Sequence, residues 1–535
     1  MSTVRDAALD VLRAHGLTTI FANPGSTEIA FLVDLPDDLQ FVLGLHEGSV
    51  VGAATGYALA QQRAAFVLLH TTAGLGNAVG ALATAQVNRA PLVVVVGQQD
   101  RRHLVQEPFL TGRLEGLAGE YPVSTETPAR PQDVPGALAR ASHSANLHKG
   151  PALVVVPSGD WDEPADDVPV PAADLLRKAT DVDIETVDTV ARLLEQAARP
   201  ALVVGAGADD ERTWDGLVRL VERLGCPVWQ EAFGARAGFP QDHPGFAGHL
   251  PADRPSLREV LSAHDLVLVV GAPVLRQYQF HAGPLAGPDT RFVVVTDDAD
   301  EAAHAPVSLA VVAPLPAFCE RLAGAVAASN CVAGFSSKRP EPPSPPAPGE
   351  PLLASHVLSA MAARLPEDAI VVEETPSSRP DLHALLPARR PMGFVSAAMG
   401  GLGFALPAAV GLRMGGERPV VAIIGDGASL YAIQALWTAV HYRVGVLVVV
   451  LANGRYAVMD QLAEAAGTKP AWPGFEEIDV SAIAAGFGCP TRRVASLDDL
   501  VTVLDDVLPG LGRRQEPLLL EVPVQPGQPW PAPRW

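Results

Sequence analysis

The stretch that decides the fold is VVAIIGDGASLYAIQALWTAVHYRVGVLVVVLANG, which runs from Val420 to Gly454. It begins and ends with apolar, largely β-branched runs at 420–424 and 444–452, and residues 429–442 between them have the composition of a helix. A strand, a helix and a second strand in this order form a βαβ unit, in which the two strands are parallel. The stretch therefore predicts an α/β fold built on parallel sheets.

Polar residues follow both predicted strands. Asp426 stands directly after the first strand between Gly425 and Gly427, and Asn453 follows the second strand 27 residues later. Because the carboxyl ends of parallel strands meet at one edge of a sheet, we expect Asp426 and Asn453 to lie close together.

These residue types point to a metal and a diphosphate. A carboxylate, an amide oxygen and the backbone carbonyl just beyond Asn453 form an all-oxygen ligand set that suits Mg²⁺ or Ca²⁺. The flanking glycines would let a diphosphate approach the backbone, and the N-terminus of the 429–442 helix would donate amides to it. The alternative is an ordinary turn in which Asp426 caps the helix. The Asn453-Gly454 pair at the end of an apolar strand favours the metal–diphosphate site.

The same alternation of short apolar runs and helical stretches continues along the other residues of this 535-residue chain. We expect three doubly wound parallel-sheet domains, at residues 1–165, 185–330 and 352–535. An acidic segment, 160–183, and a proline-dense segment, 335–351, are predicted as linkers. Further strands are predicted at 18–21, 41–45, 65–69, 92–96 and 152–156, and in the middle domain at 201–204, 266–270 and 292–296.

The middle domain contains part of a dinucleotide-binding motif. Its first predicted strand leads into Gly205-Ala206-Gly207, but Asp210 occupies the place of the third glycine. A carboxylate there would face the pyrophosphate of a nucleotide. The pattern favours a structural turn over a nucleotide site.

Charge and cysteine content narrow the class of protein. The formal net charge of −21 argues against a nucleic acid or an anionic membrane surface as a partner. Residues 1–16 carry charges in an amphipathic pattern rather than the apolar core of a signal peptide, and the run 444–452 is too short to span a bilayer. The cysteines have no spacing typical of disulfides or zinc, which fits the cytoplasm. They are Cys226, Cys319, Cys331 and Cys489.

Several further motifs, taken with GDG…NG, identify a family. They are Asn23-Pro24-Gly25-Ser26, Leu45-His46-Glu47, Leu69-His70, Gly97-Gln98-Gln99, Gly271-Ala272-Pro273-Val274 and GGLGFALP at 400–407. With these motifs the chain resembles the thiamine-diphosphate-dependent decarboxylase and acetolactate synthase superfamily over nearly its whole length, and within it the benzoylformate decarboxylases. The resemblance implies a pyrimidine-binding first domain, a middle domain without cofactor, and a diphosphate-binding third domain.

The resemblance also implies roles for individual residues toward thiamine diphosphate and Mg²⁺. Asp426, Asn453 and the carbonyl of Arg455 would bind the metal, and Gly400, Gly425 and Gly427 would approach the cofactor. Leu402 would be the apolar wedge that bends the cofactor. Glu47 would hydrogen-bond and protonate the aminopyrimidine ring, although a carboxylate in the first turn of a helix is also favoured by the helix dipole alone.

The expected substrate contacts are less uniform. Ser26 would bind the substrate carboxylate, unless it caps a helix from Thr27 onward. His70 would transfer protons, unless it is a hydrogen-bonded structural histidine. The family's second histidine has no direct counterpart: Tyr278 stands at its position and His281 follows three residues later, so either could fill the role. The expected substrate pocket comprises Ser26, Leu110, Ser396, Val458 and Leu462, of which Ser396 and Leu462 stand where the family has bulky rings.

The function implied is non-oxidative decarboxylation of a benzoylformate-like 2-oxo acid to an aldehyde and CO₂. Two alternatives remain: an acetolactate-synthase-like or aldehyde-lyase carboligase, and a non-catalytic binding protein on the same fold. The expected partners are a small-molecule 2-oxo acid and further copies of the chain in a homo-oligomer, a dimer of dimers. No nucleic acid and no membrane are expected.

Overall fold

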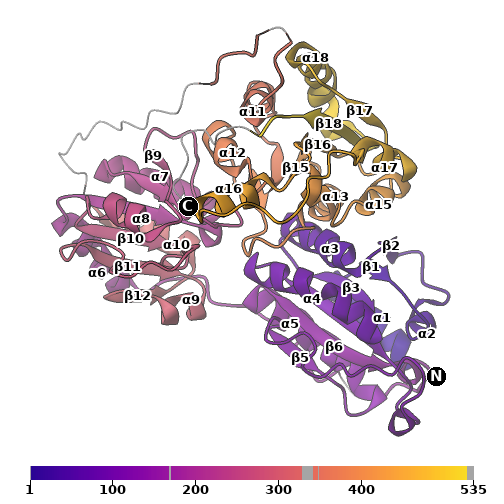
Figure 1. Ribbon diagram of the computed structural model, residues 1–535. Helices are drawn as coiled ribbons and strands as arrows, with labels where there is room; N and C mark the ends of the chain where they lie inside the picture. Colours follow the sequence, from indigo (N-terminus) through magenta and orange to yellow (C-terminus); the bar gives the residue numbers. More distant parts are fainter. Residues whose placement is uncertain (1, 168–169, 328–341, 348, 527–535) are drawn as a thin grey trace.

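The computed structural model describes residues 2–167, 170–327, 342–347 and 349–526. In this part of the chain there are three six-stranded sheets whose strands all pair in parallel. Figure 1 shows them as three lobes: an indigo-to-purple first domain, a magenta middle domain, and an orange-to-yellow third domain. The predicted fold class is confirmed.

The first sheet has the strand order β2-β1-β3-β4-β6-β5. Its strands are β1 Thr19–Asn23, β2 Gln40–Leu43, β3 Ala65–His70, β4 Leu92–Gln98, β5 Ser124–Glu126 and β6 Pro151–Pro157. Its helices are α1 Val4–Ala14, α2 Ile29–Leu32, α3 Glu47–Gln61, α4 Thr71–Val87 and α5 Val134–His148. The central strands β3, β4 and β6 are almost entirely buried, because helices cover both faces of a parallel sheet.

The third sheet repeats this topology, with the order β14-β13-β15-β16-β18-β17. Its strands are β13 Ile370–Glu374, β14 Phe394–Ser396, β15 Val420–Gly425, β16 Leu447–Ala452, β17 Thr491–Arg493 and β18 Leu518–Pro523. Its helices are α11 Ala354–Ala362, α12 Arg379–Leu385, α13 Ala405–Gly415, α14 Asp426–Ser429, α15 Ala435–His441, α16 Ala457–Ala465, α17 Val480–Gly486 and α18 Leu497–Val507. Counted along the chain, the strands of the first and third sheets therefore follow one order.

The middle sheet has the order β12-β11-β10-β7-β8-β9, which is that of dinucleotide-binding folds. Its strands are β7 Pro200–Val204, β8 Val228–Gln230, β9 Phe246–His249, β10 Leu266–Val270, β11 Arg291–Thr296 and β12 Leu309–Val312. Its helices are α6 Ile184–Gln196, α7 Glu211–Leu224, α8 Arg254–Leu261, α9 Ala299–His304 and α10 Leu315–Ala325.

Two hydrogen bonds within the chain hold the glycine turn of the middle sheet. The N–H of Gly207 donates to the carbonyl of Gly271 at 2.8 Å, across the point where the strand order reverses. The side chain of Asp210 caps α7 by accepting from the N–H of Thr213 at 3.0 Å. The N–H of Gly207 and the carboxylate of Asp210 thus both have hydrogen-bond partners within the chain.

The βαβ unit at 420–454 differs from prediction in its details. The single helix expected at 429–442 is wrong: α14 ends at Ser429, turns follow, and α15 begins at Ala435. Strand β16 begins at Leu447 rather than at 444, because the N–H of Val446 bonds back to Val444 in a tight turn. Val444 and Val446 are nevertheless buried, so hydrophobicity alone could not distinguish this turn from a strand.

The expected linkers also differ from the structure. Asp160, predicted to begin the first linker, is buried in a short 3₁₀ helix, Ser158–Asp160, and forms an ion pair with Arg101. The described residues between 171 and 183 form no helix or strand. Part of the proline-dense segment, at 335–341 and 348, and Cys331 lie outside the described residues.

The four strands that the sequence did not predict in the first two domains, β5, β8, β9 and β12, have only three or four residues each.

Within the described ranges, none of the helices has the length and apolar character needed to cross a bilayer.

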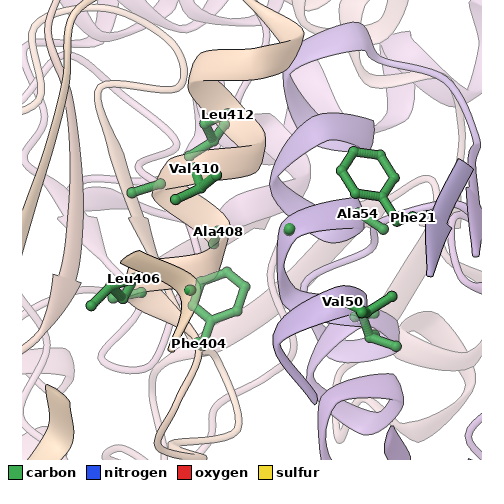
Figure 2. Close-up of a cluster of buried hydrophobic side chains, with 14 of the residues drawn as sticks. Phe21, Val50, Ala54, Phe404, Leu406, Ala408, Val410 and Leu412 are labelled. Atoms are coloured by element: carbon green, nitrogen blue, oxygen red, sulfur yellow. The ribbon is translucent and has the colours of Figure 1, made fainter. Parts of the chain in front are cut away.

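Helices α3 and α13 join the first domain to the third. A Cβ atom added at Gly56 would overlap the carbonyl of Ala408, and one added at Gly411 would overlap the carbonyl of Ala53. The two helix backbones are therefore in direct contact. Figure 2 shows the helices side by side, with apolar side chains packed around the contact. This contact positions the first sheet relative to the third.

Candidate active site

A cavity of about 550 Å³ opens at the carboxyl edge of the third sheet. Residues of the third domain line most of it, and the segment 276–278 of the middle domain contributes one side. A volume in this range suits a cofactor or a small ligand.

Asp426 and Asn453 meet at this cavity. Strands β15 and β16 are paired with Gly425 opposite Leu451, so both polar residues leave the sheet at the same edge. The Asp426 carboxylate is only 7% exposed, and it accepts the N–H of Gly427 at 2.8 Å and that of Gly454 at 2.6 Å. Burial raises the pKa of the Asp426 carboxyl above its usual value. A buried carboxylate in this position would be stabilised by a cation.

Asp426 is not a helix cap. Gly425 occupies the N-cap position of α14, and Asp426 is the first helical residue. The capping alternative is therefore wrong, and the Asp426 carboxylate instead connects the ends of two neighbouring strands.

The donor set fits a hard divalent ion with a diphosphate. In the described residues no cluster of three or more His, Cys, Asp or Glu could hold a metal. The Asp426 and Asn453 oxygens and a backbone carbonyl would therefore need oxygens from a ligand to complete a shell, as a diphosphate provides. A Cβ added at Gly425 would have no atom nearer than 4.0 Å, so there is open space beside the backbone for such a ligand. The Arg455 side chain forms an ion pair with Asp460, with Nε 3.0 Å from Oδ2.

The loop that carries Leu402 also lines the cavity. Gly400 and Gly403 have φ angles of +74° and +91°, which favour glycine. The buried carboxylate of Glu374 accepts three backbone N–H groups, from Gly403 at 2.6 Å, Phe404 at 2.8 Å and Ala405 at 2.6 Å. Burial raises the pKa of Glu374 to about 7. The sequence analysis missed Glu374, although two successive glutamates at the end of an apolar strand were a usable signal.

The carboxyl edge of the first sheet holds a second group of predicted residues. Glu47 is the first residue of α3 and is 8% exposed. Its carboxylate accepts Nδ2 of Asn23 at 3.2 Å and Nδ2 of Asn77 at 3.0 Å, so each oxygen is held by one amide. Two elements besides its own helix therefore fix the direction of the Glu47 side chain.

His70 is oriented by a carboxylate that the sequence analysis also missed. His70 ends β3, and its Nδ1 lies 3.0 Å from Oε2 of Glu28 and 2.9 Å from Oγ1 of Thr27. Glu28 is 1% exposed and also accepts the N–H of Gly25 at 2.7 Å. Both side-chain contacts use Nδ1, an arrangement that suits proton transfer at Nε2.

Ser26 and Leu110 lie in loops of the same domain. Ser26 is exposed and does not cap α2, whose N-cap is Glu28, so the capping alternative is wrong. Leu110 has a φ of +67° in the loop after the 3₁₀ helix Leu104–Gln106. Of the described cavity-lining residues, none is Ser26, Glu47, His70 or Leu110. A single chain thus leaves the predicted site residues in two groups.

The remaining predicted pocket residues are divided. Tyr278, Val458 and Leu462 line the cavity, whereas His281 and Ser396 do not. Ser396 faces the middle domain: its N–H bonds to Ala235 at 2.9 Å and its hydroxyl to Gly234 at 3.4 Å. Ala397, the next residue, lines the cavity instead.

Comparison with known proteins accounts for this architecture. Models of the thiamine pyrophosphate enzymes match the chain three times: the N-terminal TPP binding domain at 2–115, the central domain at 187–322 and the C-terminal TPP binding domain at 377–522. Benzoylformate decarboxylase of Pseudomonas aeruginosa is 38% identical over 538 residues, which cover 99% of this chain and 100% of that protein. The chain belongs to the thiamine pyrophosphate enzyme family.

Solved structures place this thiamine pyrophosphate enzyme beside decarboxylases. It is 35% identical to the 4-hydroxybenzoylformate decarboxylase of Rhodococcus jostii, with a TM-score of 0.92 and coverage of 98% of this chain and 99% of that chain. It is 33% identical to the benzoylformate decarboxylase of Polynucleobacter necessarius, with a TM-score of 0.93 and coverage of 99% and 100%. The family resemblance carried by the sequence motifs is confirmed.

Proposed function

We propose that this enzyme decarboxylates an aryl 2-oxo acid to the corresponding aldehyde and CO₂, using thiamine diphosphate and Mg²⁺. The observation that carries this proposal is full-length similarity to benzoylformate decarboxylase, combined with an all-oxygen metal set beside a cavity of about 550 Å³. Thiamine diphosphate, when bound, supplies an electron sink for the bond that breaks to CO₂.

The third domain would hold the diphosphate through the metal. Asp426, Asn453 and the carbonyl of Arg455 would coordinate Mg²⁺, and Gly400, Gly425 and Gly427 would allow the cofactor close to the backbone. Leu402 would support the bend between the two rings. The open space beside Gly425 and the two strand-end hydrogen bonds of Asp426 support this assignment.

Glu47 would hold and move a proton on the aminopyrimidine ring. A carboxylate can perform this transfer only when it points at a fixed ring nitrogen. The amides of Asn23 and Asn77, one on each carboxylate oxygen, support this role because they restrain the side chain before any ligand arrives.

His70 and Ser26 would act on the substrate. Nδ1 of His70 faces Glu28 and Thr27, so Nε2 would give and receive the proton. The exposed hydroxyl of Ser26 would bind the substrate carboxylate. Between the two candidates for the second proton carrier, the cavity-lining position of Tyr278 favours its phenol over the His281 imidazole.

The substrate side chain would lie among apolar groups. Leu110, Val458 and Leu462 would contact the aryl ring, and Ser396 would support the wall behind Ala397. These side chains are smaller than aromatic rings, so this pocket would accept a substituted ring.

We propose further that two copies of the chain complete each site. Glu47 and His70 lie on the first domain, whereas Asp426 lies at the cavity of the third, and helices α3 and α13 fix the two domains within one chain. The loop after β4 also exposes Val105 by 91% and Phe109 by 87%, which suits burial against a second copy. A dimer of dimers would provide four such sites.

Mixing two inactive variants tests the shared site. After subunit exchange, Glu47→Gln and Asp426→Ala chains should regenerate activity, because a mixed dimer contains one site without either substitution. Random exchange would restore about a quarter of wild-type sites. Mass-tagged wild-type chains would verify exchange, and verified exchange without any regained activity would contradict the proposal.

A substrate panel tests the reaction itself. We expect CO₂ and aldehyde from benzoylformate and 4-hydroxybenzoylformate, little from pyruvate, and none from Asp426→Ala. Incubation with two aldehydes tests for a carboligase, and calorimetry tests for cofactor binding by a non-catalytic protein. A ligation product without CO₂ release from any 2-oxo acid, or cofactor binding without any turnover, would replace the decarboxylase assignment.

The sheets and family matches support domain boundaries at 1–165, 185–330 and 352–535, which we propose. We likewise propose a cytoplasmic location, on the basis of the cysteine pattern, and no nucleic-acid partner, on the basis of the acidic charge.

A further inference from the structure

We propose that Glu374 and Asn88 are positioning residues that hold the 396–405 loop, and Leu402 within it, in its cavity-facing form before the cofactor binds. The importance of Leu402 rests on the proposed function. The anchoring itself rests on hydrogen bonds within the chain.

The loop needs hydrogen bonds from other residues to stay in one conformation, because its glycines allow the backbone many conformations. It contains three glycines at 400, 401 and 403, two of them with positive φ, between the end of β14 and the start of α13. Glycine loses more conformational freedom on ordering than other residues, so such a loop stays in one form only if other groups hold it.

Glu374 anchors the C-terminal side of the loop. Glu374 is the last residue of β13 and is only 2% exposed. Its carboxylate accepts hydrogen bonds from the N–H groups of Gly403, Phe404 and Ala405. These amides immediately follow Leu402, so they determine where its backbone enters α13. One buried side chain thereby satisfies three donors at the helix N-terminus.

Asn88 anchors the N-terminal side from another domain. It follows α4 of the first domain and is fully buried. Its Nδ2 donates to the carbonyl of Ser396 at 2.9 Å, and its Oδ1 accepts the N–H of Ala398 at 3.0 Å. The carbonyl of Asn88 accepts Nη1 of Arg236, from the middle domain, at 2.8 Å. All three domains therefore contribute to holding this loop.

The consequence is a preorganised wedge. Cofactor binding does not have to pay the entropic cost of ordering a loop that is already ordered. The anchors would therefore raise cofactor affinity without taking part in the reaction. Substitution of an anchor should weaken cofactor binding through Leu402.

Hydrogen exchange in the cofactor-free protein tests the anchoring. In Glu374→Gln, an amide group replaces one acceptor oxygen and faces a backbone donor, so we expect about tenfold faster exchange at 403–405. Asn88→Ala should do the same at Ala398. Glu373→Gln is the matched control: Glu373 is buried on the same strand but bonds Thr375 and Arg379 instead of the loop. Unchanged exchange at 403–405 in Glu374→Gln would overturn the proposal.

Calorimetry with thiamine diphosphate and Mg²⁺ tests the link to Leu402. We expect about tenfold weaker binding in Glu374→Gln, partial recovery in Glu374→Asp, and little additional loss when Leu402→Ala is combined with Glu374→Gln. Fully additive losses would show that Glu374 does not act through Leu402. If Glu374→Gln does not fold, Glu374→Asp, whose shorter side chain cannot reach all three amides, carries both measurements. Failure of the wild type to bind would contradict the proposed function, while the exchange result would still decide the anchoring.

Discussion

The first and third sheets have the same strand order, but their carboxyl edges are built differently. At the first edge the side chains of Glu28, Glu47 and His70 are held by hydrogen bonds to neighbouring groups. At the third edge Gly400 and Gly425 leave space beside the backbone, and Asp426 lines a cavity. One topology thus carries hydrogen-bonded polar side chains at one edge and a cavity beside open backbone at the other.

The difference lies in the turns that follow the strands. Asn23, Glu47 and His70 follow or end strands of the first sheet and place polar side chains at its edge. The GDG and GGLG turns of the third sheet have almost no side chains, so backbone amides are accessible. We therefore expect turn composition, rather than strand order, to determine what each edge binds.

The largest effect should follow from breaking the third edge. We expect Asp426→Ala to lower thiamine diphosphate affinity by about 100-fold or more, because the diphosphate loses its bridging cation. Calorimetry with Mg²⁺ present would measure this. Asp498→Ala, an exposed substitution in the first turn of α18, is the control. Unchanged affinity in Asp426→Ala would mean that the third edge does not hold the metal.

Breaking the first edge should affect turnover instead. We expect His70→Ala to lower kcat by roughly 10² to 10⁴, the usual contribution of a positioned acid or base, with nearly unchanged cofactor affinity. Glu28→Gln should cause a smaller decrease and shift the pH profile, because Glu28 orients Nδ1 of His70. Pre-steady-state measurements would follow the decay of the adduct between substrate and cofactor. If this decay were as fast in His70→Ala as in the wild type, His70 would have no part in the mechanism.

The contact between α3 and α13 should tolerate little additional side-chain volume. In Gly56→Val the new side chain would overlap the carbonyl of Ala408, so we expect a loss of about 3 kcal/mol in the free energy of unfolding. Denaturant titration would measure it. Gly76→Ala is the control, because a Cβ at Gly76 would have no atom within 4 Å. Equal stability of the two variants would contradict close packing of α3 on α13.

The smallest effect concerns pH. Burial raises the pKa of Glu374 to about 7, above its unfolded value, so the folded state binds an additional proton between about pH 4.5 and 7. The stabilising contribution of protonated Glu374 is present below pH 4.5 and is lost as pH rises through 7. Relative to Glu374→Gln, the wild type should lose about 2 kcal/mol of stability from pH 5 to 8. Parallel pH dependence of the two proteins would contradict the raised pKa.

Much of the architecture was predictable because it depends on local patterns. The buried strands β3, β4, β10 and β15 appear in the sequence as short apolar runs, and each lies within two residues of its prediction. The short edge strands have little hydrophobic pattern, and they exist because a neighbouring strand offers hydrogen bonds. The interruption between α14 and α15 also went unpredicted, because the hydrophobic periodicity of the sequence gives no signal for it.

The sequence by itself determined the fold class, the family and the two strand-end motifs, because glycines, apolar runs and polar residues at strand ends act over a few residues. Only the tertiary structure decided which groups meet. Glu374 contacts the Leu402 loop from 28 residues away, and Asn88 contacts it from another domain. The separation of Glu47 from the cavity of Asp426 also follows from the packing of α3 on α13, a long-range contact that no local pattern specifies.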